Sequence, residues 1–259
     1  MTASVSRPSG AASNGPAIRT DDLAKQFGRT VALDGLTMTV ERGEVFGFLG
    51  PNGAGKTTAV KLLLGLARPS GGTARVLGAP MGDRATRARI GYLPELFRYQ
   101  PWLRGREVLE LHAALGRMPR SRRRADIATA LGLVGLTDRA ESLVGTYSKG
   151  MQQRLGLAVA LLGSPELVFL DEPTSALDPV GRLAVRSIIR GARERGTTVF
   201  LNSHLLTEVE RVCDRVAIVD QGRLIAAGRL DELLGAPALR MRVTDVAPAL
   251  IAALAKFGR

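Results

Sequence analysis

The stretch GPNGAGKTT at residues 50–58 combines the residue types that bind phosphate. It lies between a strand-like segment and a helix-like segment and matches the spacing G-x-x-x-x-G-K-[ST] at Gly50, Gly55, Lys56 and Thr57. Glycines let backbone N–H groups point inward at a helix N-terminus, which makes a concave anion site. Lys56 would reach the β- and γ-phosphates, and the Thr57 hydroxyl would bind Mg²⁺. The sequence therefore predicts a phosphate-binding loop. Its expected contacts with ATP are Gly50, Pro51, Asn52, Gly53, Ala54, Gly55, Lys56, Thr57 and Thr58.

Two adjacent acids follow the apolar run ELVFL. Asp171 ends this strand-like run, and Glu172 comes next. The carboxyl edge of a parallel sheet is where α/β proteins bind ligands, so we expect Asp171 to hold Mg²⁺ and Glu172 to polarise the attacking water. Acids are common at strand ends, but a phosphate loop upstream makes the pair indicate an ATP-hydrolysing site.

The remaining pattern shows which elements must position these side chains. Residues 17–49 alternate like antiparallel strands with a turn at ERG, and residues 69–80 form a turn-rich hairpin. A largely helical region runs to about residue 162. Apolar runs of strand length at 166–171, 197–204 and 215–220 alternate with helix-like segments, and 220–228 closes a hairpin. Such alternation is typical of a parallel sheet in an α/β core.

Composition narrows the function classes. The net charge is +12, with 36 basic residues of which five are lysines. A nucleic-acid or anionic-membrane partner and a simple bias toward arginine both explain this charge. The densest basic run, residues 117–126, lacks the aromatic residues that stack on bases, so a solvated face is the favoured interpretation. No apolar run approaches 18 residues, and the single Cys213 excludes an internal disulfide and suits the reducing cytoplasm.

The segment TYSKGMQQRLGLAVALLGSPELVFLDEPTSALDP, residues 146–179, carries a family resemblance. With the phosphate loop, it makes residues 17–230 resemble the nucleotide-binding subunit of an ATP-binding cassette (ABC) transporter. YSKGM is similar to the signature LSGGQ: Ser148 and Gly150 match it, whereas Tyr147, Lys149 and Met151 depart from it. In the family this segment faces the γ-phosphate held by the other subunit. A serine hydroxyl, a glycine and free helix N–H groups suit that role.

Other residues take roles that the resemblance implies. His204 resembles the switch histidine that contacts the γ-phosphate, so the implied catalytic residues are Lys56, Glu172 and His204. Phe27 matches the aromatic that stacks on adenine, with a core phenylalanine as the alternative. Glu95 stands where the family commonly has a glutamine, and the implied magnesium ligands are Thr57, Glu95 and Asp171. The implied dimer-interface residues are Ser148, Lys149, Gly150 and Asp178.

The resemblance also implies an organisation and a fold. We expect a P-loop NTPase core with a parallel sheet, an N-terminal antiparallel β subdomain and a helical subdomain inserted at about residues 95–162. Residues 1–16 are predicted to be a disordered tail without the apolar run of a secretory signal. The ABC ATPase domain would cover 17–230, and 231–259 would be a short C-terminal extension that resembles an incomplete accessory unit.

The expected function is ATP hydrolysis that powers export through a separate membrane permease, at the cytoplasmic face of the membrane. The implied cofactors are ATP and Mg²⁺, the implied partners are a permease and a second ATPase copy, and no nucleic acid is expected. The variants YLPE and YSKGM resemble the export branch. Tyr99 and Trp102 would anchor the permease, with a place in the buried core as the alternative for either.

Two other classes of function are weaker fits. Non-transport ABC ATPases act on nucleic acid or ribosomes, but the chain has one phosphate loop and one signature and lacks a long heptad region. A phosphate-loop kinase would leave YSKGMQQR and His204 unexplained.

Overall fold

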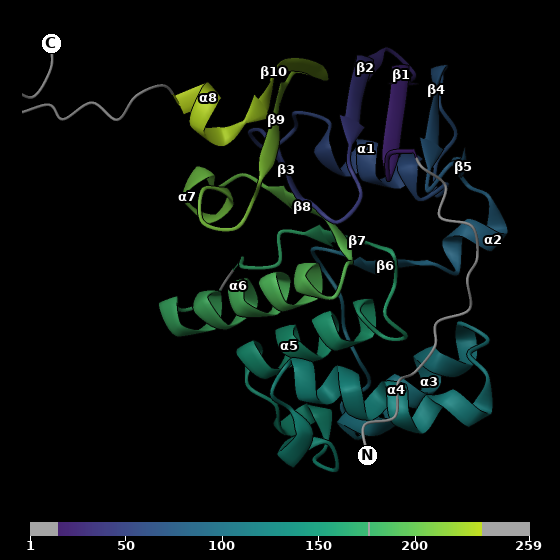
Figure 1. Cartoon of the computed structure of the whole chain (residues 1–259), viewed down its shortest axis with the longest axis vertical. Coiled ribbons are helices and arrows are strands. Elements are labelled where there is room, and N and C mark those ends of the chain that lie inside the picture. The colour runs from purple at the N-terminus through teal and green to yellow at the C-terminus, as the bar shows by residue number, and fades with distance from the viewer. Residues whose placement is uncertain (1–14, 176, 235–259) are drawn as a thin grey trace, which may run out of the picture.

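The structure is a computed structural model that describes residues 15–175 and 177–234. Most of the expected N-terminal tail and all of 235–259 lie outside the described residues. The described chain forms two sheets with helices between and below them (Figure 1).

The first sheet is antiparallel, as the alternation at its start predicts. Its four strands lie in the order β2-β1-β4-β5. They are β1 (Ile18–Phe27), β2 (Thr30–Val40), β4 (Gly71–Val76) and β5 (Ala79–Pro80). Buried and solvent-facing side chains alternate along much of β1 and β2, because one face of this sheet packs on the core while the other meets water.

The second sheet has six strands in the order β10-β9-β3-β8-β7-β6. They are β3 (Val45–Leu49), β6 (Ile90–Leu93), β7 (Leu167–Asp171), β8 (Thr198–Ser203), β9 (Arg215–Asp220) and β10 (Arg223–Arg229). All neighbouring pairs are parallel except β9 and β10, which form the predicted closing hairpin. Every residue of β3, β7 and β8 is buried, as expected for central strands covered on both faces.

The structure corrects one expectation about strands and adds one strand that was not predicted. The turn at ERG does not join two paired strands, because β3 leaves the antiparallel sheet and pairs in parallel with β8 and β9. All five residues of β3 are apolar or glycine, so the strand is stable only where both faces are covered. The edge strand β6 was not predicted, because its four residues are too few for a clear period.

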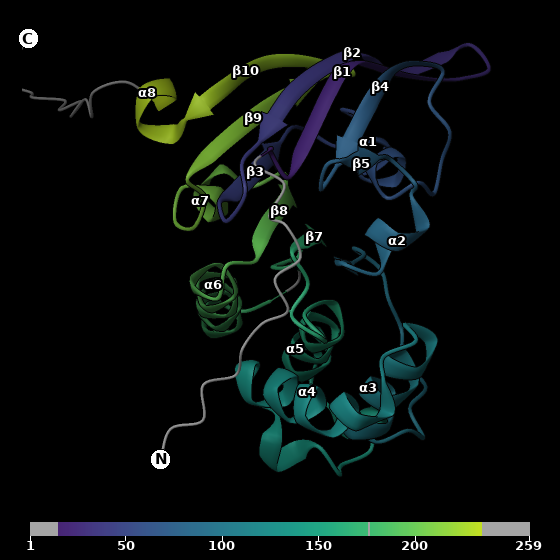
Figure 2. The same cartoon turned by 45° about the vertical axis from the view of Figure 1, so that its right-hand side comes forward.

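Helices cover both faces of the parallel sheet (Figures 1 and 2). One face packs on α1, which lies between the two sheets, and three phenylalanines surround Phe200 there with ring centroids 5.2–5.8 Å from its own. The other face packs on α5 and α6. The helices are α1 (Lys56–Leu63), α2 (Arg84–Arg87), α3 (Gly105–Leu115), α4 (Arg120–Leu133), α5 (Lys149–Ala160), α6 (Pro179–Glu194), α7 (Leu206–Val209) and α8 (Leu230–Leu234).

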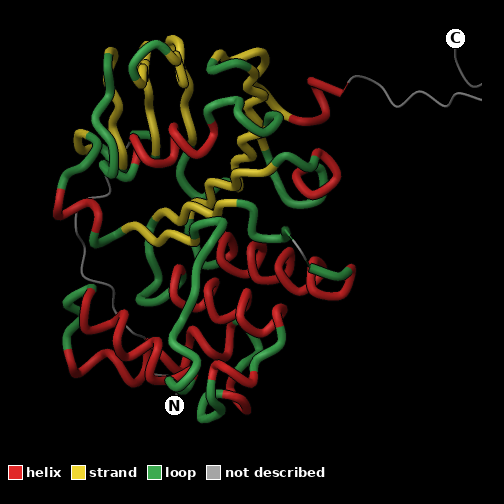
Figure 3. The backbone as a smooth tube through the Cα atoms, turned by 180° about the vertical axis from the view of Figure 1, so that it is seen from behind, coloured by secondary structure: helices red, strands yellow, loops and turns green. Residues whose placement is uncertain are grey.

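The expected helical insert is present. Figure 3 shows α3, α4 and α5 gathered on one side of the parallel sheet, with the antiparallel sheet on the other. The insert begins after β6 and returns to the core through α5. Within residues 15–175 and 177–234, no helix combines the length and the apolar composition that crossing a bilayer requires.

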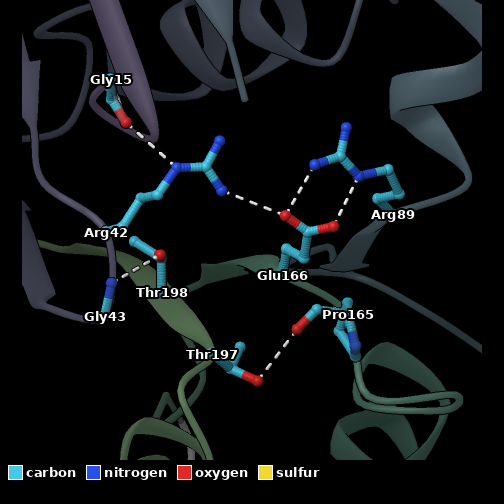
Figure 4. A network of polar contacts seen from close by, with 8 residues as sticks. All are labelled: Gly15, Arg42, Gly43, Arg89, Pro165, Glu166, Thr197 and Thr198. Atoms are coloured by element: carbon cyan, nitrogen blue, oxygen red, sulfur yellow. Dashed lines mark hydrogen bonds and ion pairs between the residues drawn. The ribbon is translucent and has the colours of Figure 1, made fainter. Parts of the chain in front are cut away.

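Glu166 joins the amino ends of several strands of the parallel sheet (Figure 4). It accepts hydrogen bonds from Arg89 at 2.6 Å in a bidentate pair and from Arg42 at 3.0 Å. These partners hold the pKa of Glu166 below its ordinary value, Arg89 contributing most. Nearby, the Thr197 hydroxyl donates to the Pro165 carbonyl at 2.9 Å. These bonds secure the end of the sheet that faces away from the carboxyl edge.

Candidate functional site

A cleft of about 510 Å³ opens at the carboxyl edge of the parallel sheet. It gathers ten of the predicted site residues from four separate segments. Its walls are Thr30, Val31, Ala32, Asn52, Gly53, Gly55, Lys56, Thr57, Thr58, Glu95, Asp171, Glu172, Asn202 and His204. Residues far apart in the chain therefore meet around one space, as parallel strands ending at one edge require.

The phosphate loop joins β3 to α1 in the predicted strand–loop–helix order. Gly55 has φ +97°, and a Cβ there would lie 2.2 Å from the Ala32 carbonyl oxygen, so only glycine fits this close approach to β2. Lys56 begins α1, and its ammonium donates to the carbonyls of Gly50 at 2.7 Å and Pro51 at 3.2 Å. The ammonium group of Lys56 is thus held against the carbonyls of the loop itself, beside the cleft.

The two acids lie on adjacent positions with different environments. Asp171 is buried and accepts a hydrogen bond from the Asn202 side-chain amide. Burial raises the pKa of Asp171, and the nearby charges of Glu95 and Glu172 raise it further, against the lowering effects of Asn202 and Lys56. A cation in the cleft would relieve this accumulation of negative charge.

Glu172 is held in an unusual backbone conformation beside its neighbour His204. Its φ is +51°, in the left-handed region that non-glycine residues rarely adopt. Its N–H donates to the Asn202 carbonyl at 2.9 Å, and one carboxylate oxygen lies 2.9 Å from Nδ1 of His204. Strained residues of this kind cluster at functional sites when the surrounding structure holds them.

The segment after His204 is tied to α6. Arg186 forms two hydrogen bonds with Glu208, at 3.0 and 2.7 Å, and Arg182 lies 3.6 Å from the same carboxylate. Arg182 also donates to the Leu177 carbonyl at 3.1 Å. The bonds connect the loop after Glu172 with the helix that follows His204.

Glu95 follows β6 and faces the cleft. Burial raises the pKa of Tyr92 to about 12, and the charges of Asp171 and Glu95 contribute to the shift. Asn202 also lines the cleft and was missed by sequence reasoning. A signal was present, since an amide side chain directly follows the apolar run 199–201, two positions before His204.

Comparisons with known proteins agree with this geometry. The family described as ABC transporter matches residues 33–175. An ABC transporter ATP-binding protein of Nostoc sp. is 51% identical over 227 residues, which is 84% of this chain and 68% of that protein. The chain belongs to the ABC transporter family of ATP-binding proteins.

Further relatives support the membership. The daunorubicin/doxorubicin resistance ATP-binding protein DrrA of Streptomyces peucetius is 41% identical and covers 88% of this chain and 71% of its own length. The Nod factor export ATP-binding protein I of Paraburkholderia xenovorans is 39% identical, over 84% of this chain and 72% of its own. A solved ATP-binding subunit of an ABC transporter superposes with a TM-score of 0.75 at 30% identity, covering 84% of this chain and 91% of that one. The predicted ABC ATPase fold is therefore confirmed, and ATP hydrolysis is the general activity of the family.

The residues present fit Mg²⁺ bound with a nucleotide. Glu95, Asp171 and Thr57 offer oxygen ligands in one cleft, which is the donor type that Mg²⁺ prefers. In the described parts of the chain, no group of three His, Cys, Asp or Glu side chains forms a cage for a metal. Two carboxylates and a hydroxyl suit an ion that is also held by phosphate oxygens and water.

Several residues that the ABC resemblance singled out lie outside the cleft walls. Ser148 caps α5 and accepts the Met151 N–H at 3.2 Å, and Asp178 caps α6 and accepts the Gly181 N–H at 2.8 Å. The described residues that line the cleft do not include Ser148, Lys149, Gly150 or Asp178. The dimer roles of these four residues stay predictions.

The three aromatic predictions turn out differently. Phe27 is 53% exposed at the end of β1, with the Lys25 ammonium 4.6 Å from its ring centroid, so it is not a core phenylalanine. Its stacking on adenine stays a prediction. Tyr99 is partly buried and packs edge-on against His112, whereas Trp102 is 69% exposed. Of the two expected anchors for the permease, Trp102 is the more exposed.

Proposed function

We propose that this ABC ATP-binding subunit works as a pair of copies, hydrolysing ATP to drive export through a separate membrane permease at the cytoplasmic face. The observation that carries the proposal is an incomplete site. The cleft collects Lys56, Asp171 and Glu172, yet the capped start of α5 at Ser148 contributes nothing to it. A second copy placed head to tail would bring its Ser148 and Gly150 to the phosphates.

The chain's own residues suggest how the reaction proceeds. Lys56 and the loop N–H groups bind the phosphates, and Mg²⁺ held by the predicted oxygen ligands would neutralise part of the phosphate charge. Glu172 accepts a proton from the attacking water, while His204, 2.9 Å from its carboxylate, orients that base and contacts the γ-phosphate. Closure of the two copies excludes other water, and loss of the γ-phosphate lets them part.

The segment after Glu95 supports a permease contact. Leu96 is 88% exposed and Trp102 is 69% exposed, and aromatic and apolar side chains of this kind anchor protein interfaces. This segment connects the cleft residue Glu95 to α3 of the helical insert, so a shift at the nucleotide would reach the permease through it.

The direction of transport rests on relatives. Two relatives that match over more than four fifths of this chain are named for daunorubicin/doxorubicin resistance and for Nod factor export. They support export as the proposed direction.

The test uses a chain that binds ATP without turning it over. Glu172→Gln keeps the shape of the side chain but removes the base, so we expect MgATP to convert the variant from monomer to dimer by light scattering. Adding Ser148→Arg, at the exposed cap of α5, should return it to monomer without changing its fold. Undiminished ATP turnover in Glu172→Gln would refute the role of the base.

The partner is tested with the same variant expressed in its own host. We expect a polytopic membrane protein to co-purify in stoichiometric amount after gentle solubilisation with MgATP. Ribosomes or nucleic acid in its place would overturn the transport proposal.

A further inference from the structure

Asn202 is a buried polar residue that directly follows an apolar run in its strand. It lies in β8 after Val199, Phe200 and Leu201, is 1% exposed, and stands opposite Asp171 in the parallel register. Burying an amide costs free energy unless its hydrogen bonds are made, so a leucine or valine would suit the core better. Packing alone therefore does not explain an asparagine at this position.

Asn202 touches both acids of the site. Its side-chain NH₂ donates to Oδ1 of Asp171, which leaves Oδ2 of that carboxylate for another partner. Its backbone carbonyl accepts the N–H of Glu172 at 2.9 Å, where the backbone has its left-handed φ of +51°. One residue thus fixes the side chain of the first acid and the main chain of the second.

The second polar atom of the Asn202 side chain is its carbonyl oxygen, Oδ1. Oδ1 of Asn202 is buried and accepts no hydrogen bond from any group in residues 15–175 and 177–234. Buried polar atoms in native proteins almost always have a partner, supplied by protein or by ordered water. Since Asn202 lines the cleft, a water molecule held there is the donor that fits this oxygen.

We infer that Asn202 is a positioning residue for magnesium at this site. It holds the Asp171 carboxylate in one orientation toward the cleft and offers Oδ1 to a water of the ion's hydration shell. Residues that orient a metal ligand typically affect metal affinity by about 10–100-fold when they are replaced. The inference rests on the proposed role of Asp171 as a magnesium ligand.

The experiment measures nucleotide binding and not turnover. A fluorescent N-methylanthraniloyl derivative of ATP is titrated against the wild-type chain and Asn202→Leu, first in EDTA and then over a range of Mg²⁺ concentrations. Asn202→Thr is a second variant that suits a strand, and its hydroxyl, one bond shorter, does not reach Asp171. Thr197→Val is the matched control, because it removes another buried hydrogen bond beside β8 at the opposite end of the sheet.

We expect both Asn202 variants to bind the nucleotide in EDTA as the wild type does. Each should need about 10–100-fold more Mg²⁺ for half of the Mg²⁺-dependent change, while Thr197→Val follows the wild type. An unchanged Mg²⁺ titration in a folded Asn202 variant, or an equal shift in Thr197→Val, would overturn the inference alone. Absence of any Mg²⁺-dependent binding in the wild type would overturn the proposed site as well.

Discussion

The ion pair between Arg186 and Glu208 offers the sharpest test of how the site is supported. Glu208 is only 4% exposed and Arg186 14% exposed, and two hydrogen bonds of 3.0 and 2.7 Å join them. The pair links α6 to α7, which begins two residues after His204. Among the described residues, Glu208 is the only acid in contact with Arg186.

The structure sets the size of the effect. Removing one partner of a buried ion pair typically costs about 3–5 kcal/mol, because the other charge stays buried. The loss of stability in Glu208→Leu should lie at the upper end of this range, because this change leaves Arg186 without an acid. Arg186→Met should lie at the lower end, because Arg182, 3.6 Å from Glu208 and 37% exposed, takes over part of the pairing. For a domain of this size these losses lower Tm by roughly 6–20 °C.

Urea unfolding with a double-mutant cycle is the assay. We expect the double variant Arg186→Met/Glu208→Leu to be more stable than either single variant, because no unpaired charge remains. Arg190→Met is the control on the same helix. It loses one exposed hydrogen bond to the Arg211 carbonyl and should cost less than about 1 kcal/mol. Single variants within about 1 kcal/mol of wild type, or a double variant that equals the sum of both losses, would refute the reasoning.

Three further predictions concern the cleft and its surroundings. Gly55→Ala should lose more stability than Gly53→Ala in urea, because both have positive φ but only the Gly55 methyl meets a carbonyl oxygen at 2.2 Å; equal losses would contradict this. Asp171→Asn should stabilise the nucleotide-free chain at neutral pH, because burial raises the pKa of the carboxyl and so penalises its charge. That gain should shrink as the pH falls toward the ordinary pKa of 3.8, where aspartate carries less charge in both states, and a constant gain would argue against it. Trp102→Ala should change stability by less than about 0.5 kcal/mol yet release the co-purifying permease, and retention of the permease would remove Trp102 from the interface.

Much of the chemistry of this chain is local and could be predicted. The phosphate loop could be predicted because the spacing of its glycines, Lys56 and Thr57 between a strand and a helix defines it. Asp171 and Glu172 are readable for the same reason, since an apolar strand that ends in acid places them at the carboxyl edge. The alternation of strands with helices likewise indicated the α/β core, and the family resemblance implied the helical insert.

The pairing of strands that lie far apart in the chain could not be predicted from the sequence. The strand β3 follows β2 after a short turn, yet it belongs to the other sheet, because its five buried residues need cover on both faces. No spacing reveals that the Glu172 carboxylate lies 2.9 Å from His204, or that Asn202 bonds Asp171 from the neighbouring strand. These contacts depend on strand register, which is set by packing over the whole sheet.

The sequence by itself thus determined the kinds of chemistry present and the elements that carry them, because residue type and local spacing decide both. Only the tertiary structure decided which side chains meet. It brought Lys56, Glu95, Asp171, Glu172, Asn202 and His204 to one cleft. It also kept Ser148 out of that cleft, because the fold of one chain leaves the start of α5 outside the cleft walls.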